Sequence, residues 1–436
     1  MERDSSTNQV ETTGRYIVLL PEEELSFGVS ALSDLTGNND IDDSMVSNLG
    51  VAALELDPDQ LKYLSNSASR RQRILAIRPE QYMYATTNSS SEYLRGYKDG
   101  VSSLIDNLNN NQTGFSKQAN SSAFLNGNAT WGLEATNVIN STYSGRGIKV
   151  AVLDTGLDLN HPDFSTRLIE SESFIDGESV QDRSGHGTHC IGTACGSIIS
   201  SDPSSKMRYG IAYNAEIFAC KVLNDQGRGP ERSVFRGINW AIQNDCHIIS
   251  MSLGSKVKPG ETFDPIYEDI ARRALNKGVL IVAAAGNRSN RPGNINPVDR
   301  PANSPSIMAV AALDSELGVS FYSNGSVNLN GGSVDIAAPG GNNRESAIYS
   351  TYSTDTVPML DFLGREIDPN PPSKYKAISG TSMATPHVAG IAALYAEATG
   401  KRGLELWTLL LRDAQRLNLA TIDVGIGLVQ APVIIN

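Results

Sequence analysis

The sequence predicts an α/β protein with a mainly parallel sheet covered by helices on both faces, preceded by a smaller α/β domain. From residue 131 onward, strand-like apolar runs alternate with helix-like segments. These runs are almost continuously apolar, which is typical of strands buried on both faces of a parallel sheet. A separate strand–helix–strand pattern occupies residues 15–85 and is followed by a stretch rich in Asn and Ser.

Length and composition agree with this organisation. The 436 residues suit two or three domains, and the 40% hydrophobic content supplies a large core. The net charge of -12 argues against a nucleic-acid-binding protein, because such proteins need basic surfaces. No apolar run approaches the roughly 20 residues that span a membrane. We therefore expect a monomer without nucleic-acid partners or a membrane span.

The N-terminus does not indicate the compartment in which the protein acts. Residues 1–14 form a polar tail without the basic and apolar regions of a signal peptide. The chain is therefore expected either to be cytoplasmic or to be a secreted chain whose leader has been removed. Four cysteines lie close together in apolar segments, and we expect buried free thiols rather than a disulfide framework. They are Cys190, Cys195, Cys220 and Cys246.

The first domain, residues 15–85, is predicted to be a small sandwich of strands and helices. Strands are expected at residues 16–20, 51–56 and 74–77, the last ended by Pro79. Asp57 can cap a helix, because Pro58 suits its first turn and Gln60 follows three residues later. Residues 86–130 are too polar to offset their ordering entropy, so they predict a flexible linker that is open to proteolytic processing.

In residues 131–436, polar side chains follow the predicted strands, where sites form in parallel sheets. Strands are expected at 148–153, 216–223, 247–253, 278–286, 307–313 and 334–338, and helices at 232–245, 265–277 and 383–399. Asp154, His186, Asn287 and Ser382 lie in Gly-rich turns at strand ends or helix starts. They could supply, in that order, the carboxylate, the base, the oxyanion donor and the nucleophile of an acyl transfer.

Each of these residues has a simpler explanation when it is taken alone. Asp154 and Asn287 could be ordinary turn residues, His186 could be half of a metal site, and Ser382 could cap a helix. All four occur together, and three of them follow the chain order Asp, His, Ser. This makes the simpler explanations improbable as a set.

The longer segments around these residues resemble the subtilisin-like serine proteases (subtilases). The resemblance covers about residues 131–436 and lies in AVLDTGLDLNHPDF, SGHGTHCIGTACG, MSLG, AAAGN and SGTSMATPHVAG. It implies a three-layer subtilisin-like fold and a serine endopeptidase that needs no cofactor for its chemistry. It also implies that Asp154, His186 and Ser382 form the catalytic triad and that Asn287 is the oxyanion amide.

The same resemblance implies a cleft for a peptide or protein substrate. Two segments would hold the peptide as an added β-strand, and a third would line the pocket for the P1 residue, which precedes the scissile bond. The strand-like segments are Gly227, Arg228 and Gly229, and Ser252, Leu253 and Gly254; the pocket residues are Ala284, Ala285 and Gly286. Gly227 and Gly229 could also simply form a turn.

Two acidic residues carry further expectations. Where the family usually has an aromatic residue before Pro-Ala, this chain has the segment PVDRPA, which places Asp299 near the base or rim of the pocket. A carboxylate there would favour Lys or Arg at P1, unless Asp299 pairs with Arg300 or faces water. Asp163 matches an acid that holds structural calcium in many members, although the loop at 197–209 departs from the usual length.

Residues 15–80 resemble, more weakly, the inhibitory propeptides of this family. We therefore expect a self-processing zymogen whose own N-terminal domain is a partner of the protease. Two alternatives stay open. The acyl-enzyme could be transferred to an amine, as in peptide macrocyclases on this fold, if the residues between Pro339 and Ser379 excluded water, although their composition indicates a surface loop. The chain could also be a non-catalytic binding module.

Overall fold

The computed structural model describes most of the chain. The described residues are 11–25, 28–37, 41–69, 74–86, 129–202, 206–328, 330–343, 345–356 and 374–433. Most of the predicted N-terminal tail and nearly all of the predicted linker lie outside these residues. The first strand, β1 (Thr12–Leu19), begins inside the segment that we expected to be tail.

A seven-stranded parallel sheet forms the centre of the larger domain, as the sequence predicts. Every neighbouring pair in this sheet is parallel. The spatial order is β12 (Ile336–Pro339), β11 (Met308–Leu313), β10 (Leu280–Ala284), β8 (Ile248–Met251), β4 (Lys149–Asp154), β6 (Glu216–Lys221) and β5 (Ile169–Ser173).

The register of the sheet brings three strand ends to one edge. Leu153 of β4 pairs with Met251 of β8, and Met251 pairs with Ala283 of β10. The next residues in each strand therefore emerge side by side, with Asp154 beside the segments that follow β8 and β10. This edge is where side chains from distant parts of the sequence can meet.

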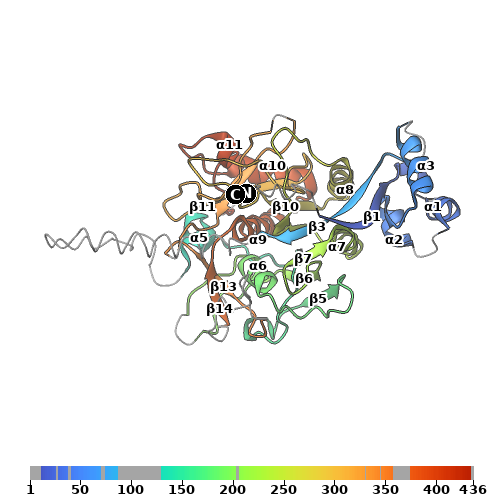
Figure 1. Ribbon diagram of the computed structural model, residues 1–436. Coiled ribbons are helices and arrows are strands. Elements are labelled where there is room, and N and C mark those ends of the chain that lie inside the picture. The colour runs from blue at the N-terminus through green and yellow to red at the C-terminus, as the bar shows by residue number, and fades with distance from the viewer. Residues whose placement is uncertain are drawn as a thin grey trace, which may run out of the picture.

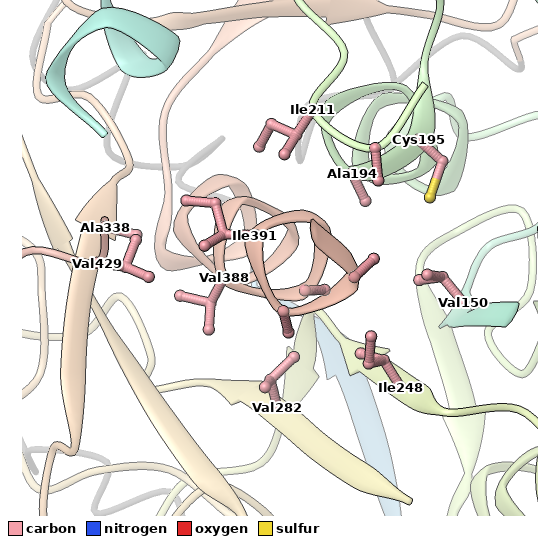
Figure 2. Packing of buried hydrophobic residues seen from close by; sticks show 14 of the residues in the cluster. Val150, Ala194, Cys195, Ile211, Ile248, Val282, Ala338, Val388, Ile391 and Val429 are labelled. Atoms are coloured by element: carbon pink, nitrogen blue, oxygen red, sulfur yellow. The ribbon is translucent and has the colours of Figure 1, made fainter. Parts of the chain in front are cut away.

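Helices cover both faces of the sheet because successive strand residues point to opposite sides. One core contains residues of α6 (His186–Cys195), α9 (Thr381–Thr399) and α10 (Gly403–Asp413). The other contains residues of α7 (Glu231–Gln243), α8 (Pro265–Asn276) and the short α11 (Thr421–Val424). Figure 2 shows Val388 and Ile391 of α9 lying between the sheet residues Ile248 and Val282 and the overlying Ile211.

Short elements complete the larger domain. They are α5 (Trp131–Ala135), η2 (Val138–Asn140), η3 (Pro162–Phe164), β7 (Arg228–Pro230), β9 (Leu253–Gly254), β13 (Ile348–Thr351) and β14 (Tyr375–Ile378). β13 and β14 form an antiparallel pair, so the expectation of a surface loop between Pro339 and Ser379 is wrong for these residues. These strands are buried against α6, since the Ser350 and Thr351 hydroxyls of β13 donate hydrogen bonds to main-chain carbonyls of that helix. Residues 357–373 lie outside the described residues.

The smaller domain is a sheet with the order β2 (Val51–Leu54), β1, β3 (Ala76–Ala85). It also carries η1 (Glu22–Glu24), α1 (Gly28–Thr36), α2 (Asp43–Leu49) and α3 (Pro58–Ser69). The predicted start of α3 is confirmed, because Asp57 Oδ1 accepts from the Gln60 amide at 2.8 Å and Gln60 Oε1 accepts from the Asp57 amide at 2.9 Å. α1 and α2 were not predicted from the sequence.

The predicted end of β3 at Pro79 is wrong, because the strand continues to Ala85. Pro79 pairs with Tyr16 on one side, while pairing with β7 on the other side begins only at Tyr82. Proline is tolerated in such an edge position, where its missing N–H interrupts no ladder. The extra residues carry β3 out of its own domain and along the larger one (Figure 1).

The two domains share one apolar core. Ile17, Leu19 and Met45 of the smaller domain belong to the same buried cluster as Phe235 of α7 and Tyr267 of α8. Figure 1 shows the smaller domain, in blue, against α7 and α8. An extended apolar contact of this kind favours a fixed arrangement of the domains over a loose tether.

Charged side chains also join the domains. Arg78 of β3 donates to both carboxylate oxygens of Glu231, at 2.7 and 3.0 Å, and its Nε lies 2.5 Å from Asp264. Glu80 accepts from the Arg232 amide at 2.8 Å, in the first turn of α7. The N-cap residue of α7, Pro230, supplies no side-chain hydrogen bond, so Glu80 caps this helix from the other domain.

All four cysteines are buried and unpaired, as expected. None of the described helices combines the length and the apolar character that a transmembrane span requires.

Candidate active site

Asp154 and His186 form a buried hydrogen-bonded pair. Asp154 ends β4 and His186 begins α6, and both side chains are almost fully buried. His186 Nδ1 donates to Asp154 Oδ1 at 2.6 Å, and Asp154 Oδ1 also accepts from the Thr155 amide at 2.7 Å. His186 Nε2 has no hydrogen-bond partner among the described residues. The imidazole is therefore held in one orientation with its outer nitrogen free.

This pairing depends on two glycines. A Cβ atom at Gly187 would lie 2.3 Å from the carbonyl oxygen of Gly156, and one at Gly156 would lie 2.1 Å from the carbonyl oxygen of Val180. Gly156 also has a φ of 108°, which other residues rarely adopt. The glycines let the turn after β4 touch the start of α6, and this contact brings the carboxylate to the imidazole.

Asp182 supports His186 and was missed in the sequence. Its Oδ1 accepts from Thr155 Oγ1 and the Gly185 amide at 2.9 Å, and its Oδ2 accepts from the Thr188 amide at 2.8 Å. It thereby ties the turn after β4 to the first turn of α6, where a carboxylate is favoured by the helix dipole. The signal that could have revealed it is an acidic residue four positions before His186, close to a Gly-rich turn.

His186 differs from the other four histidines. Burial alone would lower its pKa, but the charge and the hydrogen bond of Asp154, helped by Asp182, raise the pKa above 6.5. Burial lowers the pKa of the remaining histidines, to about 3 or 4 where the shift is largest, and so keeps them neutral. These are His161, His189, His247 and His387. Only His186 is placed and tuned to exchange protons near neutral pH.

Ser382 lies in the first turn of α9 and is fully buried. Its Oγ lies 2.6 Å from the Thr86 carbonyl oxygen, 2.5 Å from Thr86 Oγ1 and 3.2 Å from the Ser252 carbonyl oxygen. Thr86 directly follows β3 of the smaller domain. The hydroxyl that the sequence identifies as the nucleophile thus faces the carbonyl of a peptide unit of the same chain.

Asn287 donates to that same carbonyl. Its Nδ2 lies 2.5 Å from the Thr86 oxygen, while its Oδ1 accepts from the Thr381 amide and Thr381 Oγ1 at 2.9 and 2.8 Å. Thr381 therefore fixes which end of the amide points into the site, a role that the sequence did not reveal. The Thr86 carbonyl accepts from an amide donor, as expected for an oxyanion site.

The cleft segments hold β3 as an added strand. β3 is antiparallel both to β7, with Met83 opposite Gly229, and to β9, with Ala85 opposite Leu253. The Ala85 amide donates to the Gly227 carbonyl at 2.8 Å, and the Thr86 amide donates to the Ser252 carbonyl at 3.2 Å. The predicted segments at 227–229 and 252–254 therefore pair with an extended strand of the same chain; that they bind substrate stays a prediction.

The predicted pocket residues lie at the end of β10. Ala284, Ala285 and Gly286 are buried, and Asp299 is only 3% exposed behind Gly286. Asp299 forms an ion pair with Arg288, not with Arg300, and does not face water. Burial raises the pKa of Asp299 to about 7, although the charge of Arg288 opposes this shift.

Asp163 does not fit a calcium site among the described residues. Its Oδ1 accepts from the Ser201 amide at 3.1 Å, and its Oδ2 accepts from the hydroxyls of Tyr209 and Tyr375 at 2.6 and 2.9 Å. Calcium needs six to eight oxygen ligands, whereas these three groups direct hydrogens at the carboxylate. The phenolic hydroxyls hold the position that a cation would need.

Asp154, His186 and Cys190 also place potential ligand atoms within 4.8 Å of one another. The first two are already joined by their hydrogen bond, and Cys190 Sγ donates to the Ser382 carbonyl at 3.5 Å. Burial raises the pKa of Cys190 well above 9.0, so it stays a thiol, which is a poor metal ligand. Asp154 and His186 therefore fit a proton-transfer pair, not a metal site, and the Cys190 thiol is packed next to them.

A parallel α/β sheet with a carboxylate, an oriented imidazole, a serine hydroxyl and an amide donor at one edge defines a serine hydrolase. Comparison with known proteins agrees. The model of the Subtilase family matches residues 145–427. The chain is 38% identical over 281 residues to a thermostable alkaline protease from Halalkalibacterium halodurans, a match that covers 64% of this chain and 65% of that protein.

Two other relatives are similar at the same level. Subtilisin BL from Lederbergia lenta is 38% identical over 268 residues, which is 61% of this chain and 82% of that protein. Thermitase from Thermoactinomyces vulgaris is 38% identical over 254 residues, which is 58% of this chain and 76% of that protein. The chain belongs to the subtilase family, and the matched region is a serine endopeptidase domain, a hydrolase acting on peptide bonds that needs no cofactor for catalysis.

Proposed function

We propose that the whole chain acts as a serine endopeptidase through Asp154, His186 and Ser382. The observation that carries this proposal is a peptide carbonyl, that of Thr86, placed within hydrogen-bond distance of both the Ser382 hydroxyl and the Asn287 amide. His186 is the base, because its Nε2 is free and Asp154 stabilises its protonated form.

The chemistry then follows in two halves. His186 takes the proton of Ser382 as Oγ attacks the peptide carbonyl carbon, and Asn287 donates to the resulting oxyanion. The protonated His186 gives its proton to the leaving amine, and an acyl-enzyme remains on Ser382. Water, deprotonated by His186, releases the acyl group. The start of α9 adds a field that favours negative charge at this point.

We propose further that the chain is made as a precursor and cuts itself after Thr86. Residues 81–86 lie in the cleft as a substrate strand would, and their domain packs against α7 and α8. The scissile bond would join Thr86 to Thr87, which sharpens the processing region expected at residues 86–130. Thr87 itself lies outside the described residues. The smaller domain would then act as the inhibitory propeptide that the sequence suggested.

N-terminal sequencing and mass measurement of the purified protein test both proposals. The unmodified chain is expected to yield a fragment that begins at Thr87, while the Ser382→Ala variant stays full length. A full-length chain with complete activity would overturn the precursor proposal. Absence of peptide hydrolysis in a folded protein would overturn the endopeptidase proposal, and cyclic products would assign the acyl-enzyme to transfer instead of hydrolysis.

The preference for Lys or Arg at P1 stays a prediction. It requires that the Asp299 carboxylate be available to pair with the substrate side chain. The ion pair between Asp299 and Arg288 bears directly on it.

A further inference from the structure

Asp299 and Thr86 lie close to each other, on either side of Gly254, in the predicted P1 pocket. A Cβ atom at Gly254 would lie 3.6 Å from Cγ2 of Thr86 and 3.2 Å from Cβ of Asp299, so both side chains approach the same glycine. On the opposite wall, a Cβ atom at Gly286 would lie 2.2 Å from Asp299 Oδ2. A longer side chain in place of Thr86 would therefore extend towards the Asp299 carboxylate.

That carboxylate already has a cation. Arg288, the residue directly after the oxyanion amide Asn287, forms an ion pair with Asp299 Oδ1. Asn324 links the two, because its Nδ2 donates to Asp299 Oδ1 at 3.3 Å and its Oδ1 accepts from the Arg288 amide at 3.0 Å. The same fixed amide thus holds both partners of the pair in place.

The two partners differ in their access to solvent. The Asp299 side chain is 4% exposed, whereas the Arg288 side chain is 29% exposed. Asp299 is therefore enclosed by the protein, whereas Arg288 has solvent beside it. Of the two partners, Arg288 is therefore the side chain that can move out of the ion pair.

We propose that Arg288 is a specificity-determining residue that occupies Asp299 in place of a basic substrate side chain, so that the pocket selects a small neutral P1 residue. This inference rests on the proposed endopeptidase function and names its substrate class. A P1 Lys or Arg would have to displace Arg288 and would gain only an ion pair that the pocket already has. Two cations at one carboxylate would also repel each other. The neutral Thr86 fits without disturbing the pair.

The experiment measures kcat/KM on fluorogenic peptides that share Met-Tyr-Ala before P1, copied from residues 83–85, and differ only in P1. The full chain, once it has processed itself, is expected to cleave after Thr or Ala better than after Arg by about tenfold or more. In the Arg288→Gln variant the Arg-to-Thr ratio should rise by about tenfold, mainly through a lower KM for the Arg peptide, because Asp299 is then unpaired.

Three variants serve as controls. Arg288→Lys keeps a cation beside Asp299 and should keep the neutral preference, which separates charge from folding defects. Arg288→Gln combined with Asp299→Asn should remove the gain for the Arg peptide. Arg412→Gln, at an exposed ion pair with Asp413, changes the net charge equally and should leave the ratio unchanged.

The results distinguish the two levels of the proposal. A wild-type preference for Arg or Lys at P1, or an Arg288→Gln variant with an unchanged Arg-to-Thr ratio, would overturn the role of Arg288 while leaving the endopeptidase intact. Failure of folded protein to cleave any of these peptides would overturn both.

Discussion

The side-chain hydroxyls of Thr86 and Ser382 lie 2.5 Å apart, and the Ser382 hydroxyl also lies 2.6 Å from the Thr86 carbonyl oxygen. Each hydroxyl has a single hydrogen to donate. When the Ser382 hydrogen points to either atom of Thr86, it is not available to His186 Nε2, which has no hydrogen-bond partner among the described residues. In the proposed self-cleavage, the residue that presents the carbonyl would therefore also withhold the proton whose transfer the reaction requires.

We expect the Thr86→Val variant to cut itself faster than the unmodified chain. Valine keeps the branched shape of threonine but loses the hydroxyl, and one hydrogen bond of about 1–1.5 kcal/mol corresponds to roughly a tenfold rate. The measurement is the rate at which full-length chain converts to product on a gel. Thr86→Ser, which keeps the hydroxyl, should stay slow, and Thr408→Val at an exposed site should have no effect. Slower conversion of the Val variant would refute this braking role.

The pH profile of kcat/KM should show an acid limb above pH 6.5, because only neutral His186 can accept a proton and Asp154 raises its pKa. Removal of the smaller domain would hydrate His186, lessen the lowering effect of burial and shift the limb further upward. The other four histidines have lowered pKa values, so they add no limb in this range. Initial rates at low substrate between pH 5 and 9 give the profile, and a limb below 6.5 would contradict the assignment.

The Asp154→Asn variant should lose activity by about 10⁴-fold, because an amide cannot favour the reactive form of His186 or stabilise its charge. Burst titration with an acylating substrate would separate this loss from misfolding. The exposed Asp355, which pairs with Arg183, offers a matched control in Asp355→Asn. Retention of more than a few per cent of kcat would show that Asp154 does not act on His186.

Substitution of Arg78 should weaken the hold of the smaller domain on the protease. Arg78→Ala leaves the buried carboxylates of Glu231 and Asp264 without this partner, and breaking such a pair costs about 3–5 kcal/mol. After cleavage, the fragment should dissociate faster and activity should appear with a shorter lag. Arg15→Ala, at the exposed pair with Glu55, is the control. An unchanged lag would mean that the ion pairs of Arg78 do not hold the domain in place.

The Tyr209→Phe variant should lower the free energy of unfolding by about 1–3 kcal/mol, because Asp163 loses a buried donor. Denaturant unfolding measures this difference. Calcium should not restore the loss, since Asp163 still accepts from Ser201 and Tyr375. Tyr349→Phe, whose hydroxyl contacts Asp202 instead, separates this effect from general packing. Recovery of stability in millimolar calcium would make Asp163 a metal ligand after all.

The parts that the sequence predicted well are those whose chemistry is local. Asp154 ends β4 and Asn287 follows β10, while His186 and Ser382 lie in the first turns of α6 and α9. These positions match the predicted strand ends and helix starts, and the roles stay predictions. The cap at Asp57 and the alternating strands of the large sheet depend on neighbours within a few residues. Such patterns can be recognised without knowing how distant segments meet.

The parts that the sequence missed depend on distant partners. Nothing near Thr86 indicates that its carbonyl meets Asn287, because that contact follows from the register of β3 between β7 and β9. Asp299 pairs with Arg288 instead of the adjacent Arg300, since neighbouring residues of an extended segment point to opposite sides. Asp163 accepts hydrogen bonds from tyrosine hydroxyls that lie 46 and 212 residues away in the chain.

Because Glu80 caps α7, hydrogen exchange at the start of this helix depends on whether the smaller domain is bound. While the smaller domain is in place, the Arg232 amide donates to Glu80 and is shielded from solvent exchange. If the domain is released, as proposed, α7 would have only Pro230 at its N-cap, which supplies no side-chain hydrogen bond. Deuterium uptake at this single helix turn would therefore time the release directly, in a chain whose peptidase activity need not be assayed at all.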